Sequence, residues 1–161
     1  MVPDLYDLHI DAGYVNLSWL IKNEQKTIYP KTSSISGGVT DLIELMLEDM
    51  QPGAFQNLRL RKRLDDAMHN GVPTIKMSGK QFDVTKYFPI LEARISENVS
   101  QILSSLGRIK KIGNVYMSGG GARLYHRKIQ ELFPEKTIFA PHAMSHFDGV
   151  RGLQMLAEMQ D

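Results

Sequence analysis

The sequence contains no cysteine, which excludes disulfide scaffolds, thiolate zinc sites, iron–sulfur clusters and cysteine nucleophiles. It also lacks any apolar run long enough to read as a membrane span, and residues 1–7 lack the basic and apolar regions of a signal peptide. An excess of one charge is missing too, because 19 Lys and Arg stand against 18 Asp and Glu. We therefore expect a cytoplasmic protein with no general electrostatic affinity for nucleic acid or anionic membranes.

What is present is the composition of a folded chain. The length of 161 residues corresponds to about one domain, and 42% hydrophobic with 23% charged residues excludes disordered and collagen-like classes. Apolar residues cluster at 5–10, 14–21 and 26–29, which predicts an opening β-meander. A polar, glycine-containing loop at 33–38 then precedes a helix at 39–50.

The second part of the chain alternates helices and strands. A basic cluster marks a short, exposed helix within 51–71, and Pro73 makes 72–77 an edge strand that begins a small hairpin. Apolar residues at spacings of three and four predict a long amphipathic helix over 84–106. A strand at 112–117 leads into three glycines and a helix that Pro134 ends. A short strand at 137–139, a loop at 140–146 and a helix at 150–159 complete the predicted elements.

Two glycine-bearing turns each follow a short apolar strand. Asp11 and Gly13 end the first strand, where a carboxylate could hold hydrated magnesium and the glycine could let a phosphate approach. Residues 119–121 (GGG) lie between a strand and a helix, where backbone amides can meet a nucleotide. Each turn alone is better explained as an ordinary tight turn. Together, they suggest two loops that converge on one ligand at the carboxyl edge of a sheet.

Four blocks in this order resemble the actin-like ATPases, especially the plasmid-segregation branch called ParM or StbA. Residues 8–18 (LHIDAGYVNLS) look like the second phosphate motif, and 37–42 (GGVTDL) are similar to the loop and helix start that follow it. Residues 115–124 (VYMSGGGARL) resemble the adenosine motif. The closing strand, loop and helix are resembled by Phe133, Pro134 and Pro141 together with 147–153 (FDGVRGL). The chain departs from the family pattern at three positions after Asp-x-Gly, where threonines are usual: Tyr14, Val15 and Asn16.

The resemblance implies an α/β fold, namely the ribonuclease-H-like second domain of an actin-like protein, with a mixed sheet of about five strands flanked by helices. Residues 1–161 would form this C-terminal domain, with about 53–80 as a smaller subdomain and the N-terminal domain absent from the chain. The resemblance also implies ATP or GTP with Mg²⁺ as ligands. Asp11 would be the catalytic residue and would hold the magnesium through water. Contacts to the nucleotide would come from Gly13, Tyr14, Asn16, Gly38, Gly120, Gly121, Ala122 and Leu124.

In the smaller subdomain, a basic and an acidic residue would also reach the nucleotide, and the candidates are Arg61, Lys62, Arg63 and Asp65. A solvated charged face is the simpler account of that cluster. His142 and His146 have no third ligand at zinc spacing, so we expect no structural metal.

The function implied by the resemblance is that of half a filament-forming ATPase. It would segregate plasmid DNA by nucleotide-dependent polymerisation, with partners comprising further copies of itself, the missing N-terminal domain and a DNA-bound adaptor protein. We expect no direct contact with nucleic acid or membrane. Two alternatives stay open: a fragment of a sugar or acetate kinase of the same superfamily, and an actin-like scaffold for cell division or pilus assembly. The isolated domain is expected to be inactive as an ATPase.

Overall fold

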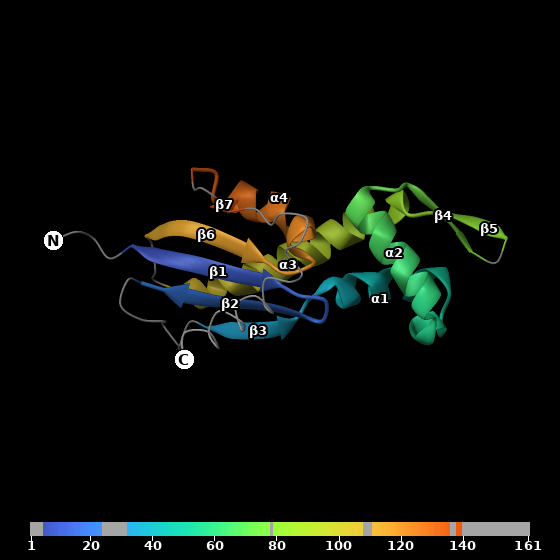
Figure 1. Ribbon diagram of the computed structural model, residues 1–161, viewed down its shortest axis with the longest axis horizontal. Coiled ribbons are helices and arrows are strands. Elements are labelled where there is room, and N and C mark those ends of the chain that lie inside the picture. Colours follow the sequence, from blue (N-terminus) through green and yellow to red (C-terminus); the bar gives the residue numbers. More distant parts are fainter. Residues whose placement is uncertain (1–4, 24–31, 78, 108–110, 136–137, 140–161) are drawn as a thin grey trace, which may run out of the picture.

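A mixed β-sheet forms one end of the molecule (Figure 1). The computed structural model describes residues 5–23, 32–77, 79–107, 111–135 and 138–139. Within these residues the sheet has five strands in the order β3-β2-β1-β6-β7. β1 pairs antiparallel with β2, which pairs antiparallel with β3, whereas β6 lies parallel to both β1 and β7. The strands are β1 (Tyr6–Ala12), β2 (Asn16–Lys22), β3 (Ser33–Ser36), β6 (Ile112–Ser118) and β7 (Ile138–Phe139).

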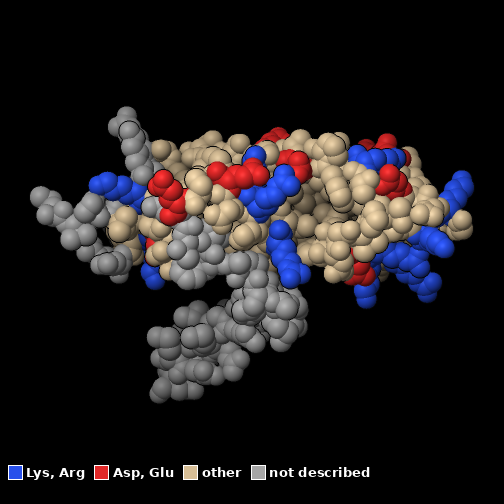
Figure 2. Space-filling model, turned by 90° about the horizontal axis from the view of Figure 1, so that it is seen from above, with Lys and Arg blue, Asp and Glu red and all other residues tan. Residues whose placement is uncertain are grey.

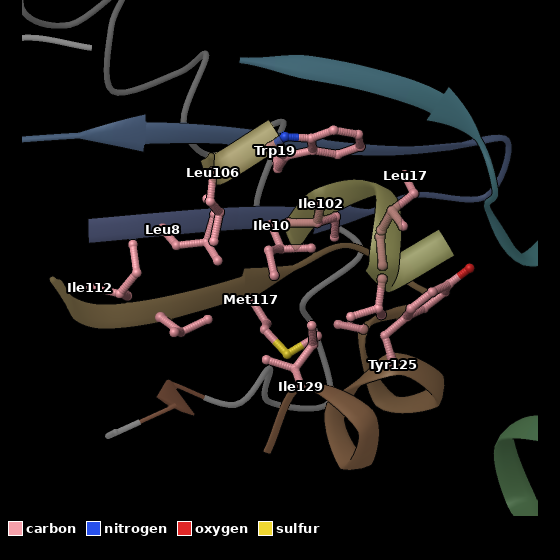
Figure 3. Packing of buried hydrophobic residues seen from close by; sticks show 14 of the residues in the cluster. Leu8, Ile10, Leu17, Trp19, Ile102, Leu106, Ile112, Met117, Tyr125 and Ile129 are labelled. Atoms are coloured by element: carbon pink, nitrogen blue, oxygen red, sulfur yellow. The ribbon is translucent and has the colours of Figure 1, made fainter. Parts of the chain in front are cut away.

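Two helices cover one face of this sheet and build the first core with it (Figure 3). They are α3 (Phe88–Leu106) and α4 (Ala122–Leu132). Alternate residues of β1, such as Leu8 and Ile10, point to this face and are at most 1% exposed, as the two-residue period of a strand requires. The indole of Trp19 on β2 donates a hydrogen bond of 2.6 Å to Ser105 Oγ on α3. Burial of each large aliphatic side chain here contributes about 1.5–3 kcal/mol.

A second core lies at the other end of the molecule. It packs α1 (Val39–Met50), α2 (Leu58–Asn70) and the hairpin of β4 (Thr74–Met77) and β5 (Lys80–Asp83) against the start of α3. Two 3₁₀ turns, η2 (Ala54–Gln56) and η3 (Thr85–Tyr87), lead into α2 and α3. Most residues of α2 are polar or charged. Its buried residues are Leu60, Leu64 and Ala67, whose spacing of four and three places them on one face of the helix.

Most elements agree with the pattern of the sequence, including the mixed sheet flanked by helices. One expectation is wrong: residues 33–38 were predicted as a loop, yet Ser33–Ser36 forms the edge strand β3. The backbone hydrogen bonds of β3 come from its pairing with β2. Ile35 is its one partly buried residue, so the sequence of β3 lacks the alternation of apolar and polar residues that predicts a strand. The long helix begins later than predicted, because η3 occupies 85–87. The predicted strand at 26–29, loop at 140–146 and helix at 150–159 lie outside the described residues.

Candidate functional site

Three turns meet at the carboxyl end of β1. The β1–β2 turn is closed by the Gly13 amide, which donates to the Asn16 carbonyl at 2.9 Å. The start of α1 is fastened to this turn, because the Gly38 amide donates to the Val15 carbonyl at 3.0 Å. The start of α4 is fastened to β1 by the Gly121 amide, which donates to the Ala12 carbonyl at 2.8 Å. The two glycine turns that the sequence singles out therefore lie side by side, and a third glycine loop joins them.

Glycine is required at these turns because the backbones approach one another closely. A Cβ on Gly38 would lie 2.6 Å from the carbonyl carbon of Tyr14. A Cβ on Gly121 would lie 2.9 Å from Val39 Cγ2. Gly119 has a positive φ of +87°, and its Cβ would lie 2.5 Å from Asp11 Oδ1. Such distances leave no room for a side chain, so these positions keep backbone amides near the end of β1.

Asp11 supplies the carboxylate of the site. Its side chain is exposed, and the hydroxyl of Ser118 at the end of β6 donates to Oδ1 at 3.2 Å. One exposed carboxylate beside glycine-rich backbone suits Mg²⁺, which keeps several of its own waters and takes few protein ligands. Among the described residues no three His, Cys, Asp or Glu side chains gather as a metal cage.

A buried polar network supports the loop before α1. Tyr125 on α4 donates from its hydroxyl to the Gly37 carbonyl, and Asn98 Nδ2 on α3 donates to the same hydroxyl at 2.8 Å. Asn98 is 2% exposed, and burial raises the pKa of Tyr125 to about 12. The sequence gives no clear signal for this network, since Asn98 interrupts an apolar helix face and Tyr125 reads as an ordinary core aromatic. Both residues hold the loop through the Gly37 carbonyl.

The link from α2 to the glycine loop is His69, which the sequence analysis does not single out. Its Nε2 lies 2.8 Å from the Gly120 carbonyl oxygen. Its Nδ1 lies 3.0 Å from the Asp65 carbonyl oxygen and 2.9 Å from Asp65 Oδ1. The hydrogen bond to Asp65 raises the pKa of His69 to about 9, against the opposing effect of burial.

The candidate charged residues of α2 lie in different surroundings. Arg61 pairs with Glu44 on α1 at 3.1 Å, and Arg63 donates to the Lys76 carbonyl of β4. Lys62 is exposed, and only Asp65 is connected to the glycine loop, through His69. Figure 2 shows Lys and Arg gathered at the end of the molecule that carries α2 and the β4–β5 hairpin, away from the end of β1.

The remaining predicted contact residues differ in exposure. Tyr14 is 48% exposed at the tip of the β1–β2 turn, and Asn16 is exposed beside it. Ala122 is fully buried in the first core, and Leu124 packs against both cores. These two residues therefore offer a ligand their backbone more than their side chains, and their role stays a prediction. None of the helices in the described part of the chain is long and apolar enough to cross a membrane.

By sequence, no family model matches the chain, and no curated protein matches it. By structure, it is similar to the archaeal actin homolog Ta0583, with a TM-score of 0.77 and 20% identity over 97% of this chain and 49% of that chain. The ADP complex of the same archaeal homolog matches with a TM-score of 0.74 and 20% identity, over 97% of this chain and 50% of that one.

A second group of similar structures consists of ParM proteins. The ParM of a 15-stranded filament from Clostridium botulinum matches with a TM-score of 0.69 and 11% identity, over 91% of this chain and 44% of that chain. The chain thus spans about half the length of the solved structures that it matches. Its fold is that of one half of the actin homologs and ParM proteins that it matches.

Proposed function

We propose that the chain is the nucleotide-binding C-terminal half of an actin-like ATPase that forms filaments. The observation that carries this proposal is the meeting of three glycine turns and the Asp11 carboxylate at the carboxyl end of β1. Close-packed glycine backbone, which leaves room for a phosphate chain, and one carboxylate at such an edge suit a nucleotide with its magnesium. The likeness to an archaeal actin homolog solved in complex with ADP supports nucleotide binding.

Each residue has a definite task in this proposal. Asp11 orients hydrated Mg²⁺ and the attacking water, and Gly13 meets the phosphates through its backbone. Gly120 and Gly121 lie against the adenosine, and Gly38 comes close to the ribose. Tyr14, Asn16, Ala122 and Leu124 complete the contacts.

Of the four charged residues of α2 that were candidates for contact with the nucleotide, we retain Asp65. Arg61 and Arg63 are engaged with Glu44 and with the β4 backbone. Asp65 is held beside the glycine loop by His69, whose Nδ1 lies 2.9 Å from Asp65 Oδ1. The side chain of Asp65 is 30% exposed, so a ribose or base donor can also reach its carboxylate.

The greater length of the matched structures supports a two-domain arrangement. We propose that an N-terminal domain with the first phosphate loop forms the other wall of the nucleotide cleft. Residues of about 53–80, which contribute α2 and the β4–β5 hairpin to the second core, form the smaller subdomain. With one wall only, the 161-residue chain binds nucleotide weakly and hydrolyses none.

We further propose that the whole protein polymerises with ATP or GTP and moves plasmid DNA in the cytoplasm. The likeness to a ParM filament supports self-association, and an adaptor protein would join the filament to DNA. The near-neutral net charge of +1 fits an indirect contact with DNA.

The test is sedimentation and negative-stain microscopy of the two-domain protein with ATP, with GTP and without nucleotide. We expect filaments that need nucleotide and that persist longer in an Asp11→Ala variant, because hydrolysis destabilises them. Asp66→Ala is the matched control, since Asp66 is an exposed carboxylate on α2. Absence of filaments under every condition would contradict the proposal, and phosphorylation of a sugar or acetate would establish a kinase instead.

A further inference from the structure

His69 is half-buried between two elements that are far apart in the sequence. It lies near the end of α2, in the second core, and reaches the loop at 119–121 that precedes α4. The distance of 2.8 Å between Nε2 and the Gly120 carbonyl oxygen is that of a well-formed hydrogen bond. The sequence separation is 51 residues, so this bond joins α2 of the second core to the loop before α4 of the first core and is not a local capping contact.

The partners of the ring define its protonation. Nε2 faces the Gly120 carbonyl, and Nδ1 faces the Asp65 carbonyl at 3.0 Å and the Asp65 carboxylate at 2.9 Å. Carbonyl and carboxylate oxygens only accept hydrogen bonds, so both ring nitrogens must carry a proton. A neutral imidazole would leave one nitrogen lone pair against an oxygen lone pair. This geometry favours the imidazolium form of His69, with the Asp65 carboxylate beside Nδ1.

The position of the bond determines what it does. A carbonyl that is held towards α2 cannot rotate towards the end of β1, where it would place a negative dipole beside a phosphate or a base. Gly120 has no side chain to restrict its peptide planes, and Gly119 before it has a positive φ. The hydrogen bond from His69 therefore restricts a rotation of the Gly120 peptide group that the glycines themselves would allow.

We propose that His69, bridging Asp65 on α2 and the carbonyl of Gly120, is a positioning residue that fixes the orientation of the glycine loop at 119–121. It acts on the ligand through the loop. The effect of His69 on a ligand rests on the nucleotide site proposed above. The hydrogen-bonded bridge from Asp65 through His69 to Gly120 does not depend on a ligand.

The first experiment uses the 161-residue chain without nucleotide. Nitrogen-15 spectra of the histidine rings, assigned by loss of one signal in His69→Gln, should show both His69 nitrogens protonated at pH 8. The Gly121 amide, which shares a peptide group with the Gly120 carbonyl, should shift together with the His69 titration. A singly protonated His69 ring at pH 8, or a Gly121 amide that ignores the titration, would overturn the proposal.

The second experiment adds ADP with Mg²⁺ and follows the Gly120 and Gly121 amides. His69→Ala should lower the affinity about tenfold, the order of one charged hydrogen bond. His69→Gln keeps a donor within reach of Gly120 and should recover affinity to within about threefold of the original chain. His126→Ala on α4 is the matched control and should leave affinity unchanged.

The two proposals can fail separately. If ADP leaves the glycine amides of the original chain unmoved, nucleotide binding by this chain fails, while the ring and amide titrations still decide the bridge. If ADP binds and His69→Ala binds it equally well, the positioning role fails and the nucleotide site stands.

Discussion

Replacing Gly119 with alanine tests whether close approach of backbones holds the site together. The φ of +87° alone strains an alanine by about 1–3 kcal/mol. The new Cβ would also lie 2.5 Å from Asp11 Oδ1 and 2.7 Å from the Ala12 carbonyl carbon. Backbone must therefore move, at a cost of about 1–3 kcal/mol for overpacking. The free energy of unfolding should fall by about 2–6 kcal/mol in all.

Gly53 provides the matched control, because its φ of +83° is nearly the same and a Cβ there would meet nothing within 4 Å. Gly53→Ala should therefore show the conformational strain alone. Urea unfolding followed by Trp19 fluorescence measures both variants, and with a slope of about 1–3 kcal/mol per molar urea the two midpoints should differ by roughly 1 M. Equal destabilisation by the two alanines, within about 0.5 kcal/mol, would refute the close-approach argument.

Three further perturbations follow from the same geometry. Tyr125→Phe leaves buried polar partners without their hydroxyl and should cost about 1–3 kcal/mol in urea unfolding, whereas Tyr14→Phe on the exposed turn should cost nothing measurable. The pKa of His69 is raised from its ordinary 6.5 to about 9, so its contribution to stability is complete below pH 6.5 and is lost as the pH rises through 9. His69→Gln should abolish that part of the decline, and an unchanged pH profile would disprove the assignment. Gly121→Ala should destabilise by about 1–3 kcal/mol, and adding Val39→Ala should recover part of the loss in a double-mutant cycle.

The sequence predicts those parts of the fold whose periodicity is strong. α3 and β1 carry continuous apolar patterns, and the turns at Gly13 and at residues 119–121 follow strands directly. Their meeting at one sheet edge could be inferred because parallel strands present their carboxyl ends together. The edge strand β3 escaped prediction because its serines gain from pairing with β2 and bury almost nothing.

Side-chain contacts between distant parts of the chain could not be predicted from the sequence, for a different reason. The bridge from His69 to Gly120 spans 51 residues, and the contact of Tyr125 with Gly37 spans 88. Such pairs depend on how helices pack and not on local spacing. A histidine on a charged helix reads as one more solvated residue, and only the packing of α2 against the glycine loop places its ring against a carbonyl.

The unbroken helix α3 contributes to both cores. Leu91 near its start is buried in the second core, while Ile102 and Leu106 near its end are buried in the first. At 1.5 Å per residue, its 19 residues span about 28 Å as one rigid rod. Fraying in either core removes support from the same ladder of helical hydrogen bonds, so hydrogen exchange should protect the middle of α3 with the full free energy of global unfolding. A force applied at the β4–β5 hairpin would accordingly be transmitted along this rod to the sheet, and the two ends would move as one body.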